Sequence, residues 1–377
     1  MSASNLAGRD RPDYEVVSNT DVTHPPDSAE VEISLFGPGF GECVVIHTGQ
    51  NEWIIVDSCL SDDGKPAALE YLSKLGVNCA RDVSHVVVSH GDNDHIGGAA
   101  ELFAACASAT LVLSTALTER EVLAWVAAYS EVDPSSLSRA TTELASIIEQ
   151  SAPRRKRFAV QDLPINVAGH YKLHALSPNH ERIKGFLATM ATKHPTAGTP
   201  RQRVGELTPN AASVVLLLET PVCNAILGAD LEEAPSGAWT HLITDSVAYR
   251  DAQPSILLKI PHHGSPNADC EALWARLAKP SIAITTTFNR GATKRPSQED
   301  VNRILSRTQN AFCCSAFSRI TAVRDHDVDK VLKRLHVVRR RRFPKLGQVR
   351  VRFKAGCQPR IELFGAATHL SDVHKAA

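Results

Sequence analysis

The sequence predicts a fold of the α/β (α+β) class, with two mixed β-sheets and helices outside them. Strand-like and helix-like segments alternate along most of the chain, and each half begins with a pair of apolar runs typical of a hairpin. Of the 377 residues, 43% are hydrophobic and 22% are charged. A chain of this composition can bury a core, so global disorder is excluded.

The first half begins as a β-meander. Its strands are expected at 31–36, 43–47 and 53–56, followed by a helix over 66–75, a strand over 83–89, a helix over 99–107 and a strand over 110–114. The segment 83–89 is short and rich in valine, which favours a strand covered on both faces. Asp57 follows the third strand directly.

Residues 115–205 are interpreted as a helical insertion, with helices over 117–129 and 134–150 and a strand over 171–176. We expect this insertion to form a wall of the functional cleft. The second half is expected to contain strands at 213–219, 224–227, 256–260 and 281–286, helices at 270–277, 299–306 and 328–335, and a basic hairpin at 349–353 and 360–364.

Three regions are predicted: a flexible N-terminal arm (1–30), a main domain (31–310) with the insertion (115–205), and a basic C-terminal extension (311–377). No stretch of about 18 apolar residues is present, and the first residues lack the apolar centre of a signal peptide. The nine cysteines form no Cys-x-x-Cys motif. We therefore expect a cytoplasmic protein with reduced cysteines and no membrane partner.

The net charge of zero conceals a strongly basic segment. Lys+Arg and Asp+Glu are 41 each, yet residues 330–360 hold 12 basic residues and no acidic one. Such a segment, with its tetrad Arg339–Arg342, attracts phosphate backbones, or else it is an ordinary charged hairpin.

The most informative motif follows the apolar strand 83–89. Within six residues, His90, Asp92, Asp94 and His95 provide two imidazoles and two carboxylates. Alternate side chains of an extended loop point the same way, so His90 and Asp92 can bind one ion, while Asp94 and His95 face a second. A turn and capping role would explain Asp94 but neither histidine. The pattern therefore predicts a metal site.

Two further strand ends carry the same residue types. Asp230 follows the strand 224–227, and the pair His262-His263 follows the strand 256–260. A carboxylate such as Asp230 can bridge two cations about 3.5–4 Å apart, as in two-metal hydrolases. Together the three strand ends predict a dinuclear site.

These motifs resemble those of the metallo-β-lactamase superfamily, and within it the hydrolase domain of ComEC-type DNA-uptake proteins. The resemblance spans about residues 31–305, without 115–205, and implies an αββα sandwich with metals at one sheet edge. The matching pieces are Phe36-Gly-Pro-Gly-Phe-Gly-Glu42, Ile55-Val-Asp57-Ser58, the loop 90–98, residues 210–219, Gly228-Ala-Asp-Leu-Glu-Glu233, Leu258-Lys-Ile-Pro-His-His-Gly-Ser265 and Arg295-Pro-Ser-Gln-Glu299.

The resemblance also implies roles for individual residues. His90 and Asp92 would bind the first metal, and Asp94, His95 and His262 the second. Asp230 would bridge the two metals, and Asp57 would orient a ligand histidine. His263 would be a further ligand or a substrate contact, and the sequence does not separate it from His262.

Three positions depart from the superfamily pattern. Asp92 stands where most members have histidine, Asn210 lies near the position of another ligand histidine, and Arg295 replaces a late histidine of the ComEC-type branch. The first two make the site richer in oxygen, which favours Mn²⁺ or Mg²⁺ over a strict preference for Zn²⁺. Arg295 is expected to hold a substrate phosphate, or its presence marks weakened catalysis.

The sequence thus predicts a metal-dependent hydrolase with two divalent ions, acting on a phosphodiester in DNA, RNA or a nucleotide. Asp94 would orient the attacking water or accept its proton, and Arg295 would stabilise the charge on the phosphoryl oxygen. Two alternatives remain open. One is acyl hydrolysis of a lactam, lactone or thioester by the same fold, and the other is a catalytically weakened module that binds nucleic acid or a partner protein.

Overall fold

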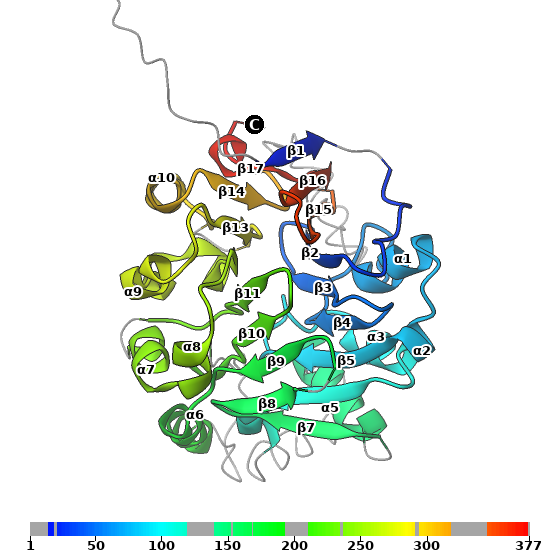
Figure 1. The fold of residues 1–377 in the computed structure, drawn as a ribbon. Coiled ribbons are helices and arrows are strands. Elements are labelled where there is room, and N and C mark those ends of the chain that lie inside the picture. Colours follow the sequence, from blue (N-terminus) through cyan, green and yellow to red (C-terminus); the bar gives the residue numbers. More distant parts are fainter. Residues whose placement is uncertain are drawn as a thin grey trace, which may run out of the picture.

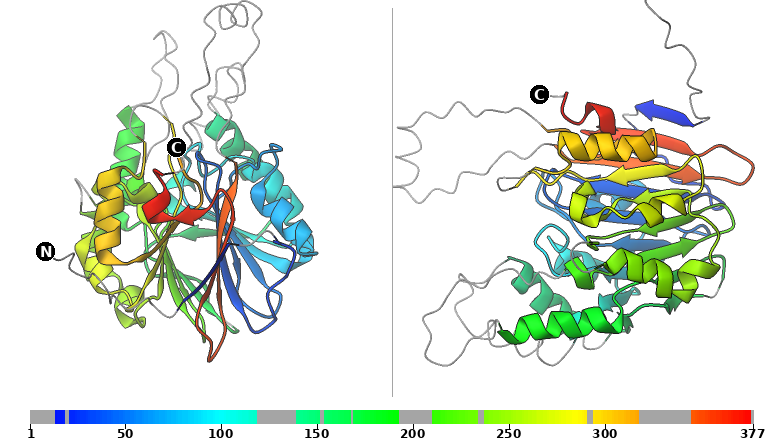
Figure 2. Two further views of the ribbon diagram at one scale, coloured as in Figure 1. Left: turned by 90° about the horizontal axis from the view of Figure 1, so that it is seen from above. Right: turned by 90° about the vertical axis from the view of Figure 1, so that its left-hand side faces the viewer.

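Two mixed β-sheets packed face to face form the centre of the chain in a computed structural model (Figure 1). Helices cover the outer face of each sheet, which gives the layer order helix, sheet, sheet, helix (Figure 2). This is the αββα sandwich that the sequence predicts. The structure describes residues 14–18, 21–118, 139–151, 154–167, 169–192, 210–233, 237–290, 294–317 and 345–375.

The first sheet begins with the meander expected from the sequence and continues as parallel strands. Its strands are β1 (Glu15–Ser18), β2 (Val31–Gly37), β3 (Cys43–His47), β4 (Trp53–Val56), β5 (Val83–Val88), β6 (Thr110–Ser114), β7 (Lys156–Ala159), β15 (Gly347–Phe353) and β16 (Arg360–Gly365). They lie in the order β1-β16-β15-β2-β3-β4-β5-β6-β7. The pairs β4·β5, β5·β6 and β6·β7 are parallel.

The second sheet has the same mixed character. Its strands are β8 (Leu163–Asn166), β9 (Lys172–Ala175), β10 (Leu216–Glu219), β11 (Asn224–Leu227), β12 (Leu257–Lys259), β13 (Ile282–Thr285), β14 (Asn310–Cys313) and β17 (Thr368–His369). They lie in the order β17-β14-β13-β12-β11-β10-β9-β8. The hairpin β10–β11 that the sequence predicts is confirmed, and β11 to β14 run parallel.

Apolar side chains form three clusters, one between the sheets and one under each helical layer. The helices are α1 (Ala67–Lys74), α2 (Cys79–Asp82), α3 (Ala99–Ala105), α5 (Arg139–Ser151), α6 (His180–Thr192), α7 (Ala238–Asp245), α8 (Val247–Asp251), α9 (Glu271–Ala275) and α10 (Gln298–Arg307). No helix within the described ranges is long and apolar enough to cross a membrane.

β5 shows how a strand at the centre of this arrangement is covered on both faces. Val86 and Val88 pack under the outer helices, whereas Val87 packs between the two sheets. Successive side chains of a strand point to opposite faces, so the part of the strand that is covered on both faces, Val86 to Val88, is apolar at consecutive positions. The prediction of a doubly covered strand is confirmed here.

The segment 115–205 differs from the expected helical insertion in its described parts. It contributes β7 to the edge of the first sheet and β8 and β9 to the second. β7 and β8 have four residues each and few buried side chains, so they lack the apolar alternation that marks a strand in a sequence. Most of the expected helix 117–129 lies outside the described residues.

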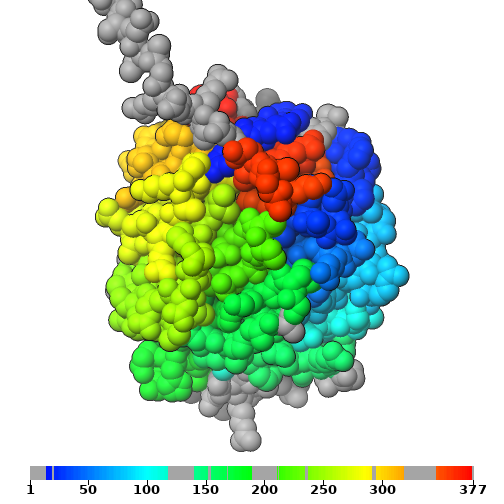
Figure 3. Space-filling model, in the orientation of Figure 1, coloured from blue at the N-terminus to red at the C-terminus, as the bar shows by residue number. Residues whose placement is uncertain are grey.

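The described parts of the expected arm (1–30) and extension (311–377) contribute strands to the sandwich. β1 pairs with β16, and β15 lies between β16 and β2 in the first sheet. In the space-filling view, the orange-red residues of β15 and β16 pack against the blue N-terminal strands (Figure 3). The expected helix 328–335 and the tetrad Arg339–Arg342 lie outside the described residues.

Two arginines of the basic segment 330–360 are buried inside the protein. Arg350 Nε donates to Glu362 Oε2 over 2.7 Å, and Arg352 Nε donates to Glu32 Oε2 over 2.9 Å. Glu32 also accepts a hydrogen bond from the Tyr71 hydroxyl. A buried charge is costly unless it is paired and hydrogen-bonded, so these arginines stabilise the fold and do not present charge to a ligand.

The Glu32–Arg352 pair gives a direct test of this packing. We expect Glu32→Ala to lower the free energy of unfolding by about 3–5 kcal/mol, because it leaves Arg352 buried without its carboxylate. Urea unfolding measures the change. The matched control is Lys354→Ala, which removes a partner of an exposed ion pair with Asp27 and should change the midpoint little. Equal midpoints for both variants would contradict the assignment.

Candidate metal centre

Asp57 shapes the loop that follows β5. Its Oδ1 accepts the backbone N–H of Ser89 over 2.7 Å, and its Oδ2 accepts the Ser89 hydroxyl over 2.6 Å. The same Oδ2 lies 2.8 Å from His95 Nδ1. An ionised carboxylate only accepts hydrogen bonds, so His95 carries a proton on Nδ1 and turns Nε2 toward the interior of the site. Asp57 thus lies where a residue that orients a ligand histidine is expected.

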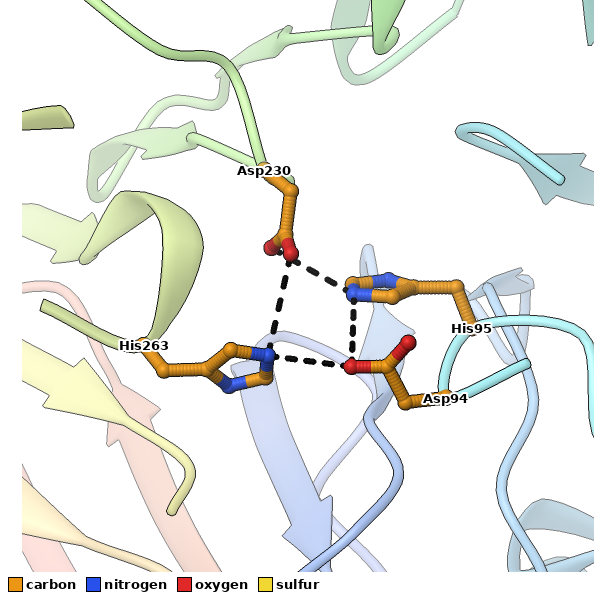
Figure 4. Close-up of side chains that lie close together, drawn as sticks. All are labelled: Asp94, His95, Asp230 and His263. Carbon is orange, nitrogen blue, oxygen red and sulfur yellow. Dashed lines mark hydrogen bonds and ion pairs between the residues drawn. The ribbon is translucent and has the colours of Figure 1, made fainter. Parts of the chain in front are cut away.

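Four buried side chains from both halves of the chain meet at one edge between the sheets (Figure 4). Asp94 and His95 come from the loop after β5, Asp230 follows β11, and His263 follows β12. His95 Nε2 lies 3.3 Å from Asp230 Oδ1, and His263 Nε2 lies 3.1 Å from Asp94 Oδ2. One ligand atom of each residue lies within 4.8 Å of the others. Imidazole nitrogens and carboxylate oxygens at this spacing can surround a divalent cation.

The location of this cluster follows from the sheet topology. Loops at the carboxyl ends of parallel strands line the binding crevice of open α/β sheets. In this fold β4 and β5 bring Asp57 and the loop 89–98 to that edge, while β11 and β12 bring Asp230 and His263 from the other sheet. The backbone N–H of Val214 donates to Ser89 O over 3.0 Å and ties the two halves together beside the site.

The backbone separates the two adjacent histidines. Both have positive φ, 46° at His262 and 52° at His263, a conformation that non-glycine residues rarely adopt. His263 points inward, is 1% exposed, and has Nδ1 2.8 Å from the Thr286 hydroxyl. His262 points away, with Nδ1 3.3 Å from Glu232 Oε1. The cluster therefore contains His263 in place of the expected His262.

Several atoms of the site lack the partners that buried polar atoms normally have. Among the described residues, His90 Nε2, His95 Nε2 and Asp230 Oδ1 are buried without a hydrogen bond of good geometry, although the last two form an ion pair with each other. Such orphaned atoms are rare in folded proteins and call for an ion or a water molecule. All three are atoms with lone pairs that bind metals, so the residues present fit the divalent cation that the sequence predicts.

The four ionisable groups of the cluster stabilise one another's charges. Burial would lower the pKa values of His95 and His263, but Asp230 and Asp94 outweigh burial and raise both. Burial would raise the pKa values of Asp94 and Asp230, but the imidazoles outweigh it and hold both below the usual range. The cluster therefore holds protons on its imidazoles in the metal-free protein, and a bound cation would displace them.

His90 and Asp92 lie beside the cluster, where a second ion is expected from the sequence. Burial, and then the neighbouring His95, lowers the pKa of His90 to about 4. Its imidazole is therefore neutral at pH 7 and can donate a lone pair to a metal. His90 Nε2 lies 3.7 Å from Asp92 Oδ2, and the rings of His90 and His95 are 4.2 Å apart between centroids.

Asn210 and Arg295 contact other groups. Asn210 Nδ2 donates to Glu232 Oε1 over 2.9 Å and lies 3.4 Å from His262 Nε2, outside the four-residue cluster. Arg295 Nη1 donates to Asp300 Oδ2 over 2.8 Å at the start of α10. Arg295 thus forms an ion pair within the protein, and its expected contact with a substrate stays a prediction.

The described part of the segment 115–205 touches the loop after β5. The backbone N–H of Ala140, in α5, donates to Asn93 Oδ1 over 3.0 Å. Glu143 of the same helix accepts the N–H groups of Gly98 and Ala100 over 3.1 and 3.0 Å. These contacts place α5 next to the loop that carries Asp94 and His95.

Two buried charges near the cluster are absent from the sequence-based assignment, Glu42 and Lys259. Lys259 is 1% exposed, and its ammonium group forms an ion pair with Glu42. The signal for Lys259 was a lysine at the end of the otherwise apolar strand 256–260. Glu42, Asp57 and His95 also lie close enough to hold a metal, but Glu42 pairs with Lys259 and Asp57 with Ser89, so we assign these carboxylates to support.

Comparison with known proteins finds a family similarity in the part of the chain that carries the first half of this site. Residues 36–120, which include Asp57 and the loop 89–98, match the model of the metallo-beta-lactamase superfamily. This part of the chain is therefore similar to the metallo-beta-lactamase superfamily. No curated protein matches the chain.

Solved structures with related folds are distant in sequence. A proposed metallo-beta-lactamase of Thermotoga maritima is 13% identical, with 51% of this chain and 68% of that chain covered and a TM-score of 0.29. Zn²⁺-bound PqqB of Methylobacterium extorquens is 11% identical, with 64% and 55% covered and a TM-score of 0.31. The metallo-beta-lactamase fold protein YhfI of Bacillus subtilis is 11% identical, with 60% and 70% covered and a TM-score of 0.30.

The adjacent histidines provide a matched pair for testing the ligand set. We expect His263→Ala to weaken Mn²⁺ or Zn²⁺ binding by more than about 100-fold, because loss of an outer hydrogen-bond partner alone costs roughly 10- to 100-fold. His262→Ala should bind the same metal with nearly unchanged affinity, since that imidazole contacts Glu232 and Asn210. Calorimetric titration of both variants measures the difference. The reverse order of affinities would contradict the assignment.

Proposed function

We propose that the protein is a metal-dependent hydrolase that cleaves phosphodiesters in nucleic acids or nucleotides. The observation that carries the proposal is the buried cluster Asp94, His95, Asp230 and His263, with its orphaned donor atoms. His90 and Asp92 would complete a second ion site beside it. Metal-dependent hydrolysis is the most frequent activity of the superfamily to which residues 36–120 match.

A pair of divalent cations in such a site would lower the pKa of bound water and stabilise negative charge on a phosphoryl oxygen. The residues of the chain would supply the rest. Asp57 holds His95 in the orientation that exposes Nε2, and Asp94 lies where a carboxylate can orient a water molecule or accept its proton. His263 is proposed as a ligand rather than as a separate catalytic group.

The composition of the ligand set supports a phosphodiester over an acyl substrate. Half of the four-residue cluster is carboxylate, and Asp92 adds another oxygen ligand beside His90. Oxygen-rich sites suit Mn²⁺ and Mg²⁺, the ions that commonly serve phosphoryl chemistry, and are less selective for Zn²⁺ than imidazole-rich sites. The proposal does not depend on Arg295, Arg350 or Arg352, because each is held in an internal ion pair.

The assay incubates the full-length chain with labelled single-stranded DNA, double-stranded DNA and RNA, each with Mn²⁺, Mg²⁺ or Zn²⁺. We expect cleavage with Mn²⁺ that falls by more than about 100-fold in Asp94→Ala, because the variant loses a group required at the ion. The control is Asp63→Ala, which removes an exposed carboxylate in the turn after β4 and should cleave like the wild type.

Equal cleavage by wild type and Asp94→Ala would contradict the assignment of Asp94 to the catalytic metal centre. Turnover of a lactam, lactone or thioester without cleavage of any nucleic acid would contradict the substrate class and leave the hydrolase assignment standing. Metal binding without turnover of nucleic acids or of acyl substrates would favour the alternative of a catalytically weakened module that binds nucleic acid or a partner protein.

A further inference from the structure

Glu42 is a buried carboxylate that contacts the Asp94 backbone directly. It is linked to two other cluster residues, Asp230 and His263, through one intervening side chain each. Its backbone N–H donates to Asp94 O over 2.8 Å. Its Oε1 forms an ion pair with the Lys259 ammonium, and its Oε2 accepts the Thr286 hydroxyl over 2.8 Å. Glu42 is 2% exposed and lies in the loop between β2 and β3, whereas Lys259 ends β12 of the second sheet and Thr286 directly follows β13 of the same sheet.

The contact through Thr286 determines which nitrogen of His263 faces the cluster. A hydroxyl has a single proton, and Thr286 gives it to the Glu42 carboxylate, which can only accept. The Thr286 oxygen, 2.8 Å from His263 Nδ1, must then accept a hydrogen bond from that nitrogen. His263 therefore carries Nδ1–H and presents Nε2 toward Asp94 and Asp230 (Figure 4).

The contact through Lys259 supports Asp230. The Lys259 ammonium donates to Ala229 O over 2.8 Å and lies 3.7 Å from Asp230 Oδ1. The buried ammonium group lies between the carboxylates of Glu42 and Asp230, so two opposite charges flank it. Glu42 thereby keeps a positive charge beside Asp230 and anchors the turn that presents it.

We propose that Glu42 is a positioning residue that fixes His263, through Thr286, with Nε2 toward the metal, and fixes Asp230 through Lys259. The inference rests on the proposed metal centre and not on the identity of the substrate. Glu42 would thus orient the ligands that come from the second sheet, as Asp57 orients His95 through a hydrogen bond. Ligand histidines commonly depend on such hydrogen-bond acceptors for their tautomer and orientation.

The donor and acceptor roles along the hydrogen bonds from Glu42 to His263 predict the effect of Glu42→Gln. Lys259 needs an acceptor, so the glutamine oxygen faces Lys259 and its NH₂ group faces Thr286. The Thr286 hydroxyl is then free to donate to His263 Nδ1. The neutral imidazole would carry its proton on Nε2, the nitrogen that faces the cluster, and lose its capacity to bind a metal there.

The test compares Thr286→Val and Thr286→Ser, because valine has the shape of threonine without the hydroxyl and serine keeps the hydroxyl. Zn²⁺ affinity is measured by competition with a chelator on the full-length chain. The protonated nitrogen of His263 is read by long-range ¹H–¹⁵N NMR of the zinc-loaded protein, which is diamagnetic. Thermal melting of each variant verifies that it is folded.

In the wild type and in Thr286→Ser we expect His263 to carry Nδ1–H, with Nε2 bound to zinc. In Thr286→Val and Glu42→Gln we expect about 10- to 100-fold weaker Zn²⁺ binding and loss of that single tautomer. Wild-type affinity and an Nδ1–H signal in folded Thr286→Val would overturn the inference.

The outcomes also separate this inference from the proposed function. Wild-type protein that binds zinc through His263 Nε2 but cleaves no phosphodiester would contradict the proposed activity alone. Wild-type protein that binds no divalent cation would contradict both.

Discussion

The burial of charged side chains between and beneath the two sheets is the constraint on which the structure depends. Each buried charge must meet an opposite charge or a hydrogen-bonding partner, because its desolvation is otherwise too costly for the fold. In the first sheet this is achieved by pairs such as Arg350 with Glu362. At the edge between the sheets, Asp94, His95, Asp230 and His263 compensate one another only in part, and their orphaned atoms mark where a cation would complete the pairing.

The support of the centre is distributed between two carboxylates from the N-terminal meander. Asp57 engages His95 and the loop after β5, while Glu42 reaches Lys259 and Thr286 in the opposite sheet. The metal centre and the packing of the two sheets are therefore coupled. We therefore expect a change at either carboxylate to alter the orientation of the ligand side chains, although neither carboxylate is itself proposed as a ligand.

Local sequence patterns predicted the elements whose burial is encoded in their own residues. The apolar strand β5 and the hairpin β10–β11 lie where the sequence places them, because their side chains match the faces that they cover. The short strands β7 and β8 could not be predicted in this way, since pairing with neighbours rather than apolar alternation makes them strands. The place of β15 next to β2 depends likewise on contacts between distant parts of the chain.

The residues of the candidate site likewise fall into those that local sequence patterns indicate and those that only the folded chain reveals. The motif from His90 to His95 and the strand ends at Asp230 and His263 were visible because residue types and strand ends are local features. The choice between His262 and His263 depends on backbone angles, and the state of Arg295 depends on a pairing with Asp300 that only the folded chain reveals. The pairing of Arg350 and Arg352 with buried acids likewise depends on distant contacts that the basic segment alone does not reveal.

Anomalous diffraction from crystals of the full-length chain grown with Mn²⁺ tests the central claim most directly. The account predicts a strong peak at roughly 2.0–2.3 Å from side-chain atoms of Asp94, His95, Asp230 and His263. A second peak near His90 and Asp92 would complete the dinuclear centre. An empty cluster, or a peak bound instead by His262 and Glu232, would contradict the account.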